Sequence, residues 1–312
     1  MTSPSDTMPD DAAGELPGQA AAPAALSATR PFFWSVRREL WENGAVWIAP
    51  LAAAGVILFG FMLALARLTS RVPTFHIASG IPHQLPAEAP YAAVALVIIV
   101  TAMIVGVFYC LGALHNERRD RSVLFWKSLP VSDLTTVLSK VFIPMVVLPV
   151  VAWVVSIAMW AIIYVASAAS AAATGSALAG LMTQAPLLTM TGGLAYGLAA
   201  MALWYAPIWG WCLLVGGWAR RVAFLWAVLP PLAIIVIERI AFDSSVFARM
   251  LKDRVNGGVV EAFSEAPHSA HGTMLQIDPV GFLSSPGLWI GLLLGAVFVA
   301  AAIWLRRYRD PI

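Results

Sequence analysis

Two histidines in the second half of the chain have the spacing of a simple metal site. His268 and His271 are three residues apart, so a helix would place both imidazoles on one face, where they could bind zinc. Pro267 and Gly272 flank the pair, and both residue types are typical of loops. We therefore interpret the two histidines as solvent-exposed loop residues and expect no metal site.

No other set of residues has a spacing typical of catalysis. The sequence offers no arrangement of Ser, His and Asp, of Cys and His, or of two carboxylates that would support acid–base or nucleophilic chemistry. It contains no Gly-x-x-x-x-Gly-Lys-Ser/Thr motif for binding nucleotide phosphates. Cys110 and Cys212 lie inside apolar runs, which favours buried, unreactive thiols. We expect a protein without catalytic activity or a cofactor of its own.

Two groups of residues inside apolar stretches are candidates for lining a path across a membrane. Glu238 and Arg239 are ionisable residues near the end of such a stretch, where charge is costly. Neighbouring residues point about 100° apart on a helix, so local ion pairing or snorkelling is the favoured interpretation. The second group, Trp204, Tyr205 and Trp209, surrounds a proline at which a kink would open a cavity.

The most distinctive run of residues joins charge to aromatic side chains. Five charged residues come first: Glu117, Arg118, Arg119, Asp120 and Arg121. They are followed by Val123, Leu124, Phe125, Trp126, Lys127, Leu129 and Pro130. An apolar patch beside charges is typical of a binding surface, and Arg and Trp are enriched in binding hot spots. The alternative is a helix at the membrane surface, with its aromatic residues in lipid and its arginines at anionic headgroups.

The composition indicates which elements must position these residues. The chain has 312 residues, of which 60% are hydrophobic and 12% charged, and its mean hydropathy is +0.80. Globular proteins are about 45–50% apolar and about 25% charged. These values exclude a soluble enzyme, a disordered protein and a disulfide scaffold, and the net charge of +2 does not suggest nucleic-acid binding. The sequence predicts an all-α polytopic membrane protein.

One membrane domain follows an acidic tail. Residues 1–29 are rich in Ala, Pro, Ser and Gly and are expected to be disordered. Residues 30–309 form the predicted transmembrane domain, which begins with an amphipathic interfacial helix over 31–43. Six stretches are long and apolar enough to span a bilayer: about 45–66, 91–114, 140–166, 185–215, 222–241 and 288–305. Pro207 in the fourth and Pro230-Pro231 in the fifth predict kinks or breaks.

The basic residues predict the orientation of the chain. With both termini in the cytoplasm, thirteen of the 19 Lys and Arg residues lie on the cytoplasmic side and six lie outside, as the positive-inside rule requires. This arrangement predicts an inner (plasma) membrane protein and leaves the segment 242–287 outside. Within that segment, the pattern around Val246–Val255 permits a short helix, and Gly257-Gly258 indicates a turn.

Glycines spaced four residues apart predict close contacts between helices. Gly193 and Gly197 lie in the fourth apolar stretch, and Gly287, Gly291 and Gly295 lie at the start of the last one. This spacing places them on one helix face, where a second backbone can approach closely. The sequence does not indicate whether the partner helix belongs to this chain or to another.

The run from Glu117 to Asp133, together with the interfacial helix and the first membrane pair before it, resembles the permease subunits of type-2 ABC exporters, which have the type V-like ABC transporter fold. The resemblance covers residues 31–309, and only this run matches in detail. It implies a membrane subunit that forms a translocation path and carries no ATPase of its own. The helix at 31–43 corresponds to the elbow helix of that family, and residues Glu117–Pro130 correspond to its coupling helix.

The family resemblance also implies partners. The coupling helix of such a permease docks on a separate ATPase subunit, which is present in two copies and binds ATP and Mg²⁺. The permease itself works as a homodimer or with a similar permease. A non-transporting membrane anchor, which recruits a cytoplasmic ATPase or another partner through the same loop, is the alternative function. The transported substrate is not indicated by the sequence.

Overall fold

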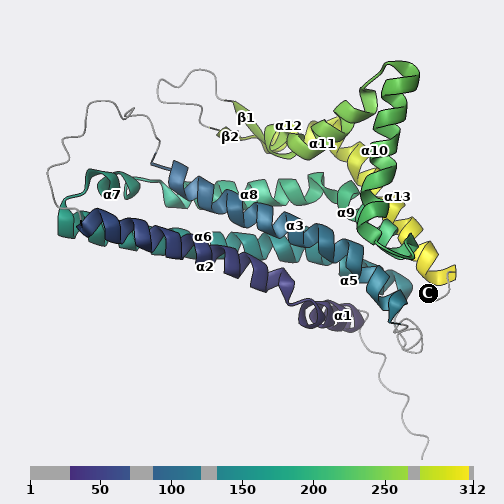
Figure 1. The fold of residues 1–312 in the computed structure, drawn as a ribbon, viewed down its shortest axis with the longest axis horizontal. Helices are drawn as coiled ribbons and strands as arrows, with labels where there is room; N and C mark the ends of the chain where they lie inside the picture. Colours follow the sequence, from purple (N-terminus) through teal and green to yellow (C-terminus); the bar gives the residue numbers. More distant parts are fainter. Residues whose placement is uncertain (1–28, 71–86, 121–131, 266–274, 309–312) are drawn as a thin grey trace, which may run out of the picture.

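The described part of the chain is almost entirely helical. The computed structural model describes residues 29–70, 87–120, 132–265 and 275–308 (Figure 1). The helices are α1 (Thr29–Glu42), α2 (Ala45–Ser70), α3 (Ala89–Arg119), α5 (Asp133–Phe142), the π-helical turn η1 (Ile143–Val147), α6 (Leu148–Thr174), α7 (Ala177–Met182), α8 (Leu187–Trp204), α9 (Ala206–Trp218), α10 (Ala223–Phe242), α11 (Val246–Ala262), α12 (Pro279–Ser284) and α13 (Pro286–Tyr308). Two short strands, β1 (Phe263–Glu265) and β2 (Leu275–Ile277), pair antiparallel.

Six helical segments of the described chain are long and apolar enough to cross a membrane, as the sequence predicts. They are Ala45–Arg67, Ala89–Arg119, Asp133–Thr174, Leu187–Trp204, Ala223–Phe242 and Pro286–Tyr308. An apolar helix of about 20 residues spans the hydrocarbon core of a bilayer. The chain is therefore an integral membrane protein.

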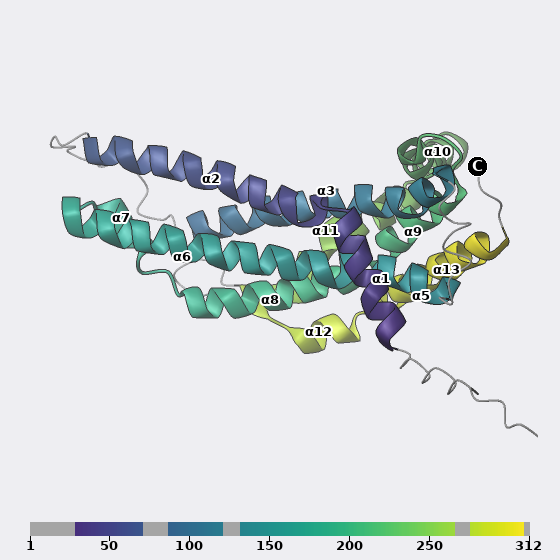
Figure 2. The same cartoon turned by 90° about the horizontal axis from the view of Figure 1, so that it is seen from below.

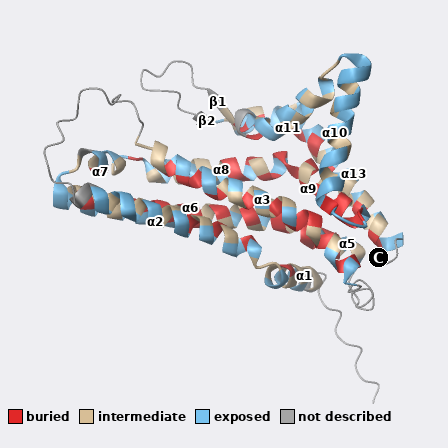
Figure 3. Cartoon of the chain, in the orientation of Figure 1, coloured by how far each residue is buried: buried red, intermediate tan, exposed pale blue. Residues whose placement is uncertain are grey.

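The long helices lie side by side, with α3 in the middle. In Figures 1 and 2, helices α2, α3, α6 and α8 follow the long axis of the molecule, and α1 lies across one end. The start of α5 and the last turn of α13 lie at this same end, which we call the charged end. Buried residues are concentrated in α3, α6 and α9 (Figure 3). Helix α10 crosses the long axis, and of its residues only Ala223 is buried.

Kinks or breaks are predicted at two proline positions, and the structure differs between them. The fourth apolar stretch is broken, as predicted, because α8 ends at Trp204 and α9 begins at Ala206, one residue before Pro207. Helix α10, in contrast, continues unbroken through Pro230 and Pro231. Proline is tolerated inside membrane helices where local adjustments satisfy the freed backbone groups.

The predicted turn at Gly257-Gly258 is wrong, because α11 passes through both glycines. The two residues are close to α8 rather than to a bend. A Cβ atom at Gly257 would lie 2.9 Å from the Trp204 ring, and one at Gly258 would lie 3.2 Å from the same ring. Their lack of side chains lets the indole pack directly on the α11 backbone. The expected helix around Val246–Val255 is confirmed and is longer than predicted.

The predicted packing glycines meet different neighbours. Gly295 brings two backbones together, since a Cβ there would lie 3.1 Å from the Ala206 carbonyl of α9. Gly287 faces the Trp204 ring, and Gly291 lies under the Arg254 side chain. Gly197 faces the ring of Phe263, whereas Gly193 has nothing within 4 Å of a Cβ position. For Gly295, the partner helix lies within the chain.

The contact between α3 and α9 gives a test of this packing. A Cβ at Gly216 would lie 2.7 Å from the Leu111 carbonyl oxygen, so we expect Gly216→Ala to force the helices apart and cost about 1–3 kcal/mol. The neighbouring Gly217→Ala is the matched control, because its nearest contact is a Leu114 methyl at 3.5 Å. Unfolding in detergent should show a loss for the first variant only; equal stability of the two would contradict the packing argument.

Candidate functional site

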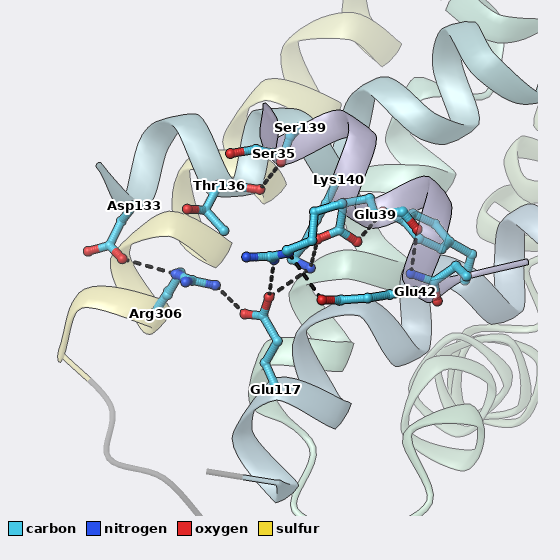
Figure 4. Close-up of polar contacts among 12 residues, drawn as sticks. Ser35, Glu39, Glu42, Glu117, Asp133, Thr136, Ser139, Lys140 and Arg306 are labelled. Atoms are coloured by element: carbon cyan, nitrogen blue, oxygen red, sulfur yellow. Dashed lines mark hydrogen bonds and ion pairs between the residues drawn. The ribbon is translucent and has the colours of Figure 1, made fainter. Parts of the chain in front are cut away.

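Six charged side chains from four helices meet at the charged end of the bundle. They are Arg38 and Glu39 of α1, Glu117 of α3, Asp133 and Lys140 of α5, and Arg306 of α13. We call this group the charge cluster (Figure 4). Three cations and three carboxylates balance one another. This balance is required, because a buried charge without a partner is strongly destabilising.

Glu117 is the centre of the charge cluster. Its carboxylate lies 3.1 Å from Nη2 of Arg38 and 3.0 Å from Nζ of Lys140, and it also accepts a hydrogen bond from Nη1 of Arg306. The residue is 8% exposed. One carboxylate therefore joins α1, α5 and α13 to the end of α3.

A second carboxylate, Glu39, completes the buried part of the cluster. Nζ of Lys140 donates to Oε1 of Glu39 at 2.7 Å, and both residues are only 1% exposed. The hydroxyl of Tyr109 donates to Oε2 of Glu39 at 2.9 Å. The amphipathic helix α1 thus turns Glu39 into the bundle, whereas three of its aromatic residues, Phe33, Trp34 and Trp41, are exposed.

Arg306 links the two ends of the segment between α3 and α5. Its Nε donates to Asp133, the first residue of α5, at 3.0 Å, while Nη1 binds Glu117 near the end of α3 (Figure 4). Ser132 caps α5 by accepting a hydrogen bond from the Thr135 backbone N–H at 3.1 Å. Both flanks of residues 121–131 are therefore held by α13.

The end of α3 is also attached to the end of α9. Arg118 donates a hydrogen bond to the Gly217 carbonyl, and Nδ1 of His115 lies 3.1 Å from the Ala219 carbonyl oxygen. Gly217 lies in the last turn of α9 and Ala219 directly follows the helix, so neither carbonyl has a helical partner of its own. A cation at this position also complements the helix dipole.

The residues predicted to couple to an ATPase fall into three groups: buried, exposed and outside the described part of the chain. Glu117 and Arg118 are buried within the chain, each 8% exposed, so they hold helices together rather than face outward. Arg119 and Asp120 are exposed and form a pair at 3.3 Å. The remaining predicted residues lie outside the described part of the chain: Arg121, Val123, Leu124, Phe125, Trp126, Lys127, Leu129 and Pro130.

The predicted path residues around Pro207 do not form one site. The indole N–H of Trp204 donates to the Arg254 carbonyl at 2.9 Å, and the Tyr205 hydroxyl donates to the Val255 carbonyl at 2.7 Å. Both residues therefore attach α11 to the break between α8 and α9. Trp209 instead lines a small apolar pocket between α3, α6 and α8. Their role in a translocation path stays a prediction.

Glu238 and Arg239 have local partners at the end of α10. The Glu238 carboxylate accepts hydrogen bonds from the backbone N–H groups of Val246 and Phe247, at 2.8 and 3.0 Å. It thereby satisfies the free donors at the start of α11. Arg239 pairs with the exposed Asp243 at 3.3 Å. These contacts agree with the local interpretation that the sequence favours.

Other candidate chemistry is limited. Within the described ranges, no three His, Cys, Asp or Glu side chains gather where they could hold a metal ion. His268 and His271 lie outside those ranges. Cys110 and Cys212 are free and buried, as their apolar surroundings predict.

Comparison with known proteins does not identify the chain. No family model, no curated protein and no solved structure matches it. The resemblance of the Glu117–Asp133 run to ABC permeases therefore rests on the sequence alone.

Proposed function

We propose that this protein is the membrane subunit of an ATP-binding cassette exporter. In this proposal, the six apolar helices form the translocation path. A separate ATPase subunit, present in two copies, binds ATP and Mg²⁺ and docks on the predicted coupling helix, Glu117–Pro130, through the residues that follow the buried Arg118. The permease acts in the cytoplasmic (bacterial inner) membrane, with both termini in the cytoplasm, as a dimer with itself or a similar permease. It catalyses no reaction of its own.

The single observation that supports this proposal most is the position of Arg306. A segment that transmits movement must be attached firmly to the helices that it moves. Arg306 binds Glu117 on one flank of residues 121–131 and Asp133 on the other. Through Glu117, Lys140 and Glu39, the same flanks are attached to α1 and α5. A force applied to the segment would therefore reach α1, α3, α5 and α13 together.

The aromatic residues of the segment provide the test. We expect Phe125→Ala combined with Trp126→Ala to reduce recovery of an ATPase subunit with the permease by at least about tenfold, because aromatic anchors carry much of the free energy of binding. The measurement is purification of the full chain from its native membranes in mild detergent, with quantification of copurified proteins that carry a phosphate-binding loop and of ATP hydrolysis.

The control variant is Trp41→Ala, which removes an aromatic side chain that is 78% exposed on α1 and lies outside the segment. It should retain the ATPase. If the Phe125/Trp126 variant retained a full complement of active ATPase, the docking assignment would be wrong. If the wild-type chain carried a partner without ATPase activity, and lost it in the same variant, the anchor function would replace the exporter.

A further inference from the structure

Helix α1 has a second face, which points away from the charge cluster. The helix lies across the charged end, whereas α2, α3, α6 and α8 follow the long axis of the molecule (Figures 1 and 2). Only Asn43 and Gly44 separate it from α2, the first of the helices that can span a membrane. An amphipathic helix in such a position is suited to the plane of the membrane surface.

This second face carries an arginine between two tryptophans, Trp34, Arg37 and Trp41, which we call the outer face of α1. The guanidinium carbon of Arg37 lies 5.1 Å from the centroid of the Trp34 ring and 5.7 Å from that of the Trp41 ring. The indoles are three residues before and four residues after the arginine, so the three side chains share one side of the helix. All three residues are exposed. Cation–π attraction thus holds the guanidinium near the indoles, and the side chain stays open to a ligand.

The carboxylates of α1 are bound elsewhere. Glu39 accepts a hydrogen bond from Lys140 at 2.7 Å and another from Arg38 at 3.0 Å. Glu42 lies 3.4 Å from Nε of Arg38. Among the carboxylates that the structure describes, none lies within ion-pair distance of Arg37. The positive charge of the outer face therefore has no described partner within the chain.

Exposed arginines and aromatic side chains occur together elsewhere at the charged end. The guanidinium carbon of Arg307, near the end of α13, lies 5.6 Å from the centroid of the Tyr308 ring, and both residues are exposed. Arg220 and Arg221 are exposed in the turn between α9 and α10. Aromatic residues are enriched at the boundary between lipid and water, and anionic lipids attract cations there. This end of the bundle is therefore suited to an anionic membrane surface.

We propose that the outer face of α1 binds anionic phospholipids of the leaflet at the charged end. The phosphate of the headgroup pairs with Arg37, to which a guanidinium can donate two parallel hydrogen bonds. Trp34 and Trp41 lie beside it at the level of the headgroups. A phospholipid meets both the cation and the exposed indoles, whereas a soluble anion would leave the indoles in water. The proposal does not depend on transport or on an ATPase, because neither enters the argument.

Lipid binding on this face also acts on the charge cluster. The same helix carries Arg38 and Glu39 on its inner side, where they bind Glu117 and Lys140. A ligand that binds only the folded state raises its stability. A phospholipid that holds α1 at the membrane surface therefore stabilises the contacts of α1 with α3 and α5, and anionic lipid should raise the melting temperature of the protein.

The experiment measures the thermal unfolding of the full chain in neutral detergent, titrated with phosphatidylglycerol or with phosphatidylcholine. We expect phosphatidylglycerol to raise the melting temperature at lower concentrations than phosphatidylcholine does. Arg37→Gln should weaken this preference about fivefold, which is the effect of one cation near an anionic lipid surface. In phosphatidylcholine the variant should melt like the wild type, because Arg37 is exposed and pairs with no described carboxylate. This second readout separates lipid binding from a structural role.

Two further variants make the result specific. Arg37→Lys keeps the positive charge and should retain most of the preference for phosphatidylglycerol. Arg239→Gln removes an exposed cation of α10 that pairs with Asp243 at 3.3 Å, and it should leave the preference unchanged.

Three results would overturn the site. The first is an equal response of the wild type to both lipids, as expected if the acidic tail predicted for residues 1–29 competed with lipid for Arg37. The second is an unchanged preference for phosphatidylglycerol in Arg37→Gln. The third is a rise with inorganic phosphate that equals the rise with phosphatidylglycerol and is lost in Arg37→Gln, because the ligand would then be a soluble anion.

Discussion

Replacing Glu117 with glutamine should lower the free energy of unfolding by about 3–5 kcal/mol, the cost of breaking a buried ion pair by removing one partner. The carboxylate binds Arg38, Lys140 and Arg306. Glutamine keeps its shape but removes the charge, which leaves three cations with Glu39 and Asp133 as their remaining carboxylates in the cluster and the half-exposed Glu42 beside Arg38. The measurement is unfolding of the full chain in detergent. Helix content and aggregation on heating are its two readouts.

Glu42 provides the matched control for this variant. It is also a glutamate of the charged end, and it contacts Arg38 at 3.4 Å, but its side chain is 51% exposed. Exposed pairs are worth at most about 1 kcal/mol, so Glu42→Gln should have a small effect. If the two variants lowered stability equally, the carboxylate of Glu117 would not be the centre of a buried network.

Hydropathy was sufficient to predict the six membrane-spanning segments of the described chain. The six apolar stretches are each present as a helix long enough to span a bilayer, because satisfying every backbone hydrogen bond within one segment leaves few alternatives in lipid. The break before Pro207 and the cap at Ser132 were also predictable, because each depends on local chemistry: a missing backbone donor and a side-chain acceptor.

The charge cluster was not predictable in this way, because it joins residues that are far apart in the sequence. Arg38 and Glu117 are separated by 79 positions, Glu39 and Lys140 by 101, and Glu117 and Arg306 by 189. Each one, taken alone, is a charge near the end of an apolar stretch, where a position facing water is the ordinary expectation. One residue of the sequence pointed to the charge cluster. Lys140 is the first residue of the predicted third span, where an ammonium group needs a partner.

Arg306 and Arg254 differ both in burial and in the groups that their side chains bind. Arg306 is 8% exposed and has two carboxylate partners. Arg254 is only partly buried, yet one of its donors has no acceptor in the described chain. The first arrangement stabilises contacts within the chain. The second attaches α11 to α8 and α13, through the Trp204 ring and the Gly287 carbonyl.

We expect a substitution at Lys140 to lower the stability of the protein as strongly as the one at Glu117. Lys140→Met removes the cation that lies between Glu39 and Glu117, at 2.7 and 3.0 Å. Two buried carboxylates then share fewer counter-charges, and we expect a loss of about 3–5 kcal/mol in the free energy of unfolding. The Glu39→Gln variant should also destabilise the protein, because it leaves the ammonium group with one carboxylate fewer.

Combining Lys140→Met with Glu39→Gln should cost less than the sum of the two single losses, by about 0.5–3 kcal/mol, because the double variant removes opposite charges together. Each variant is measured by the same unfolding titration in detergent. The exposed pair Arg119 and Asp120, 3.3 Å apart, serves as the comparison: its neutral substitutions should add to within about 0.5 kcal/mol. Additive losses for Lys140 and Glu39 would mean that their contact does not stabilise the charged end, and that the flanks of residues 121–131 are not attached to α1 through it.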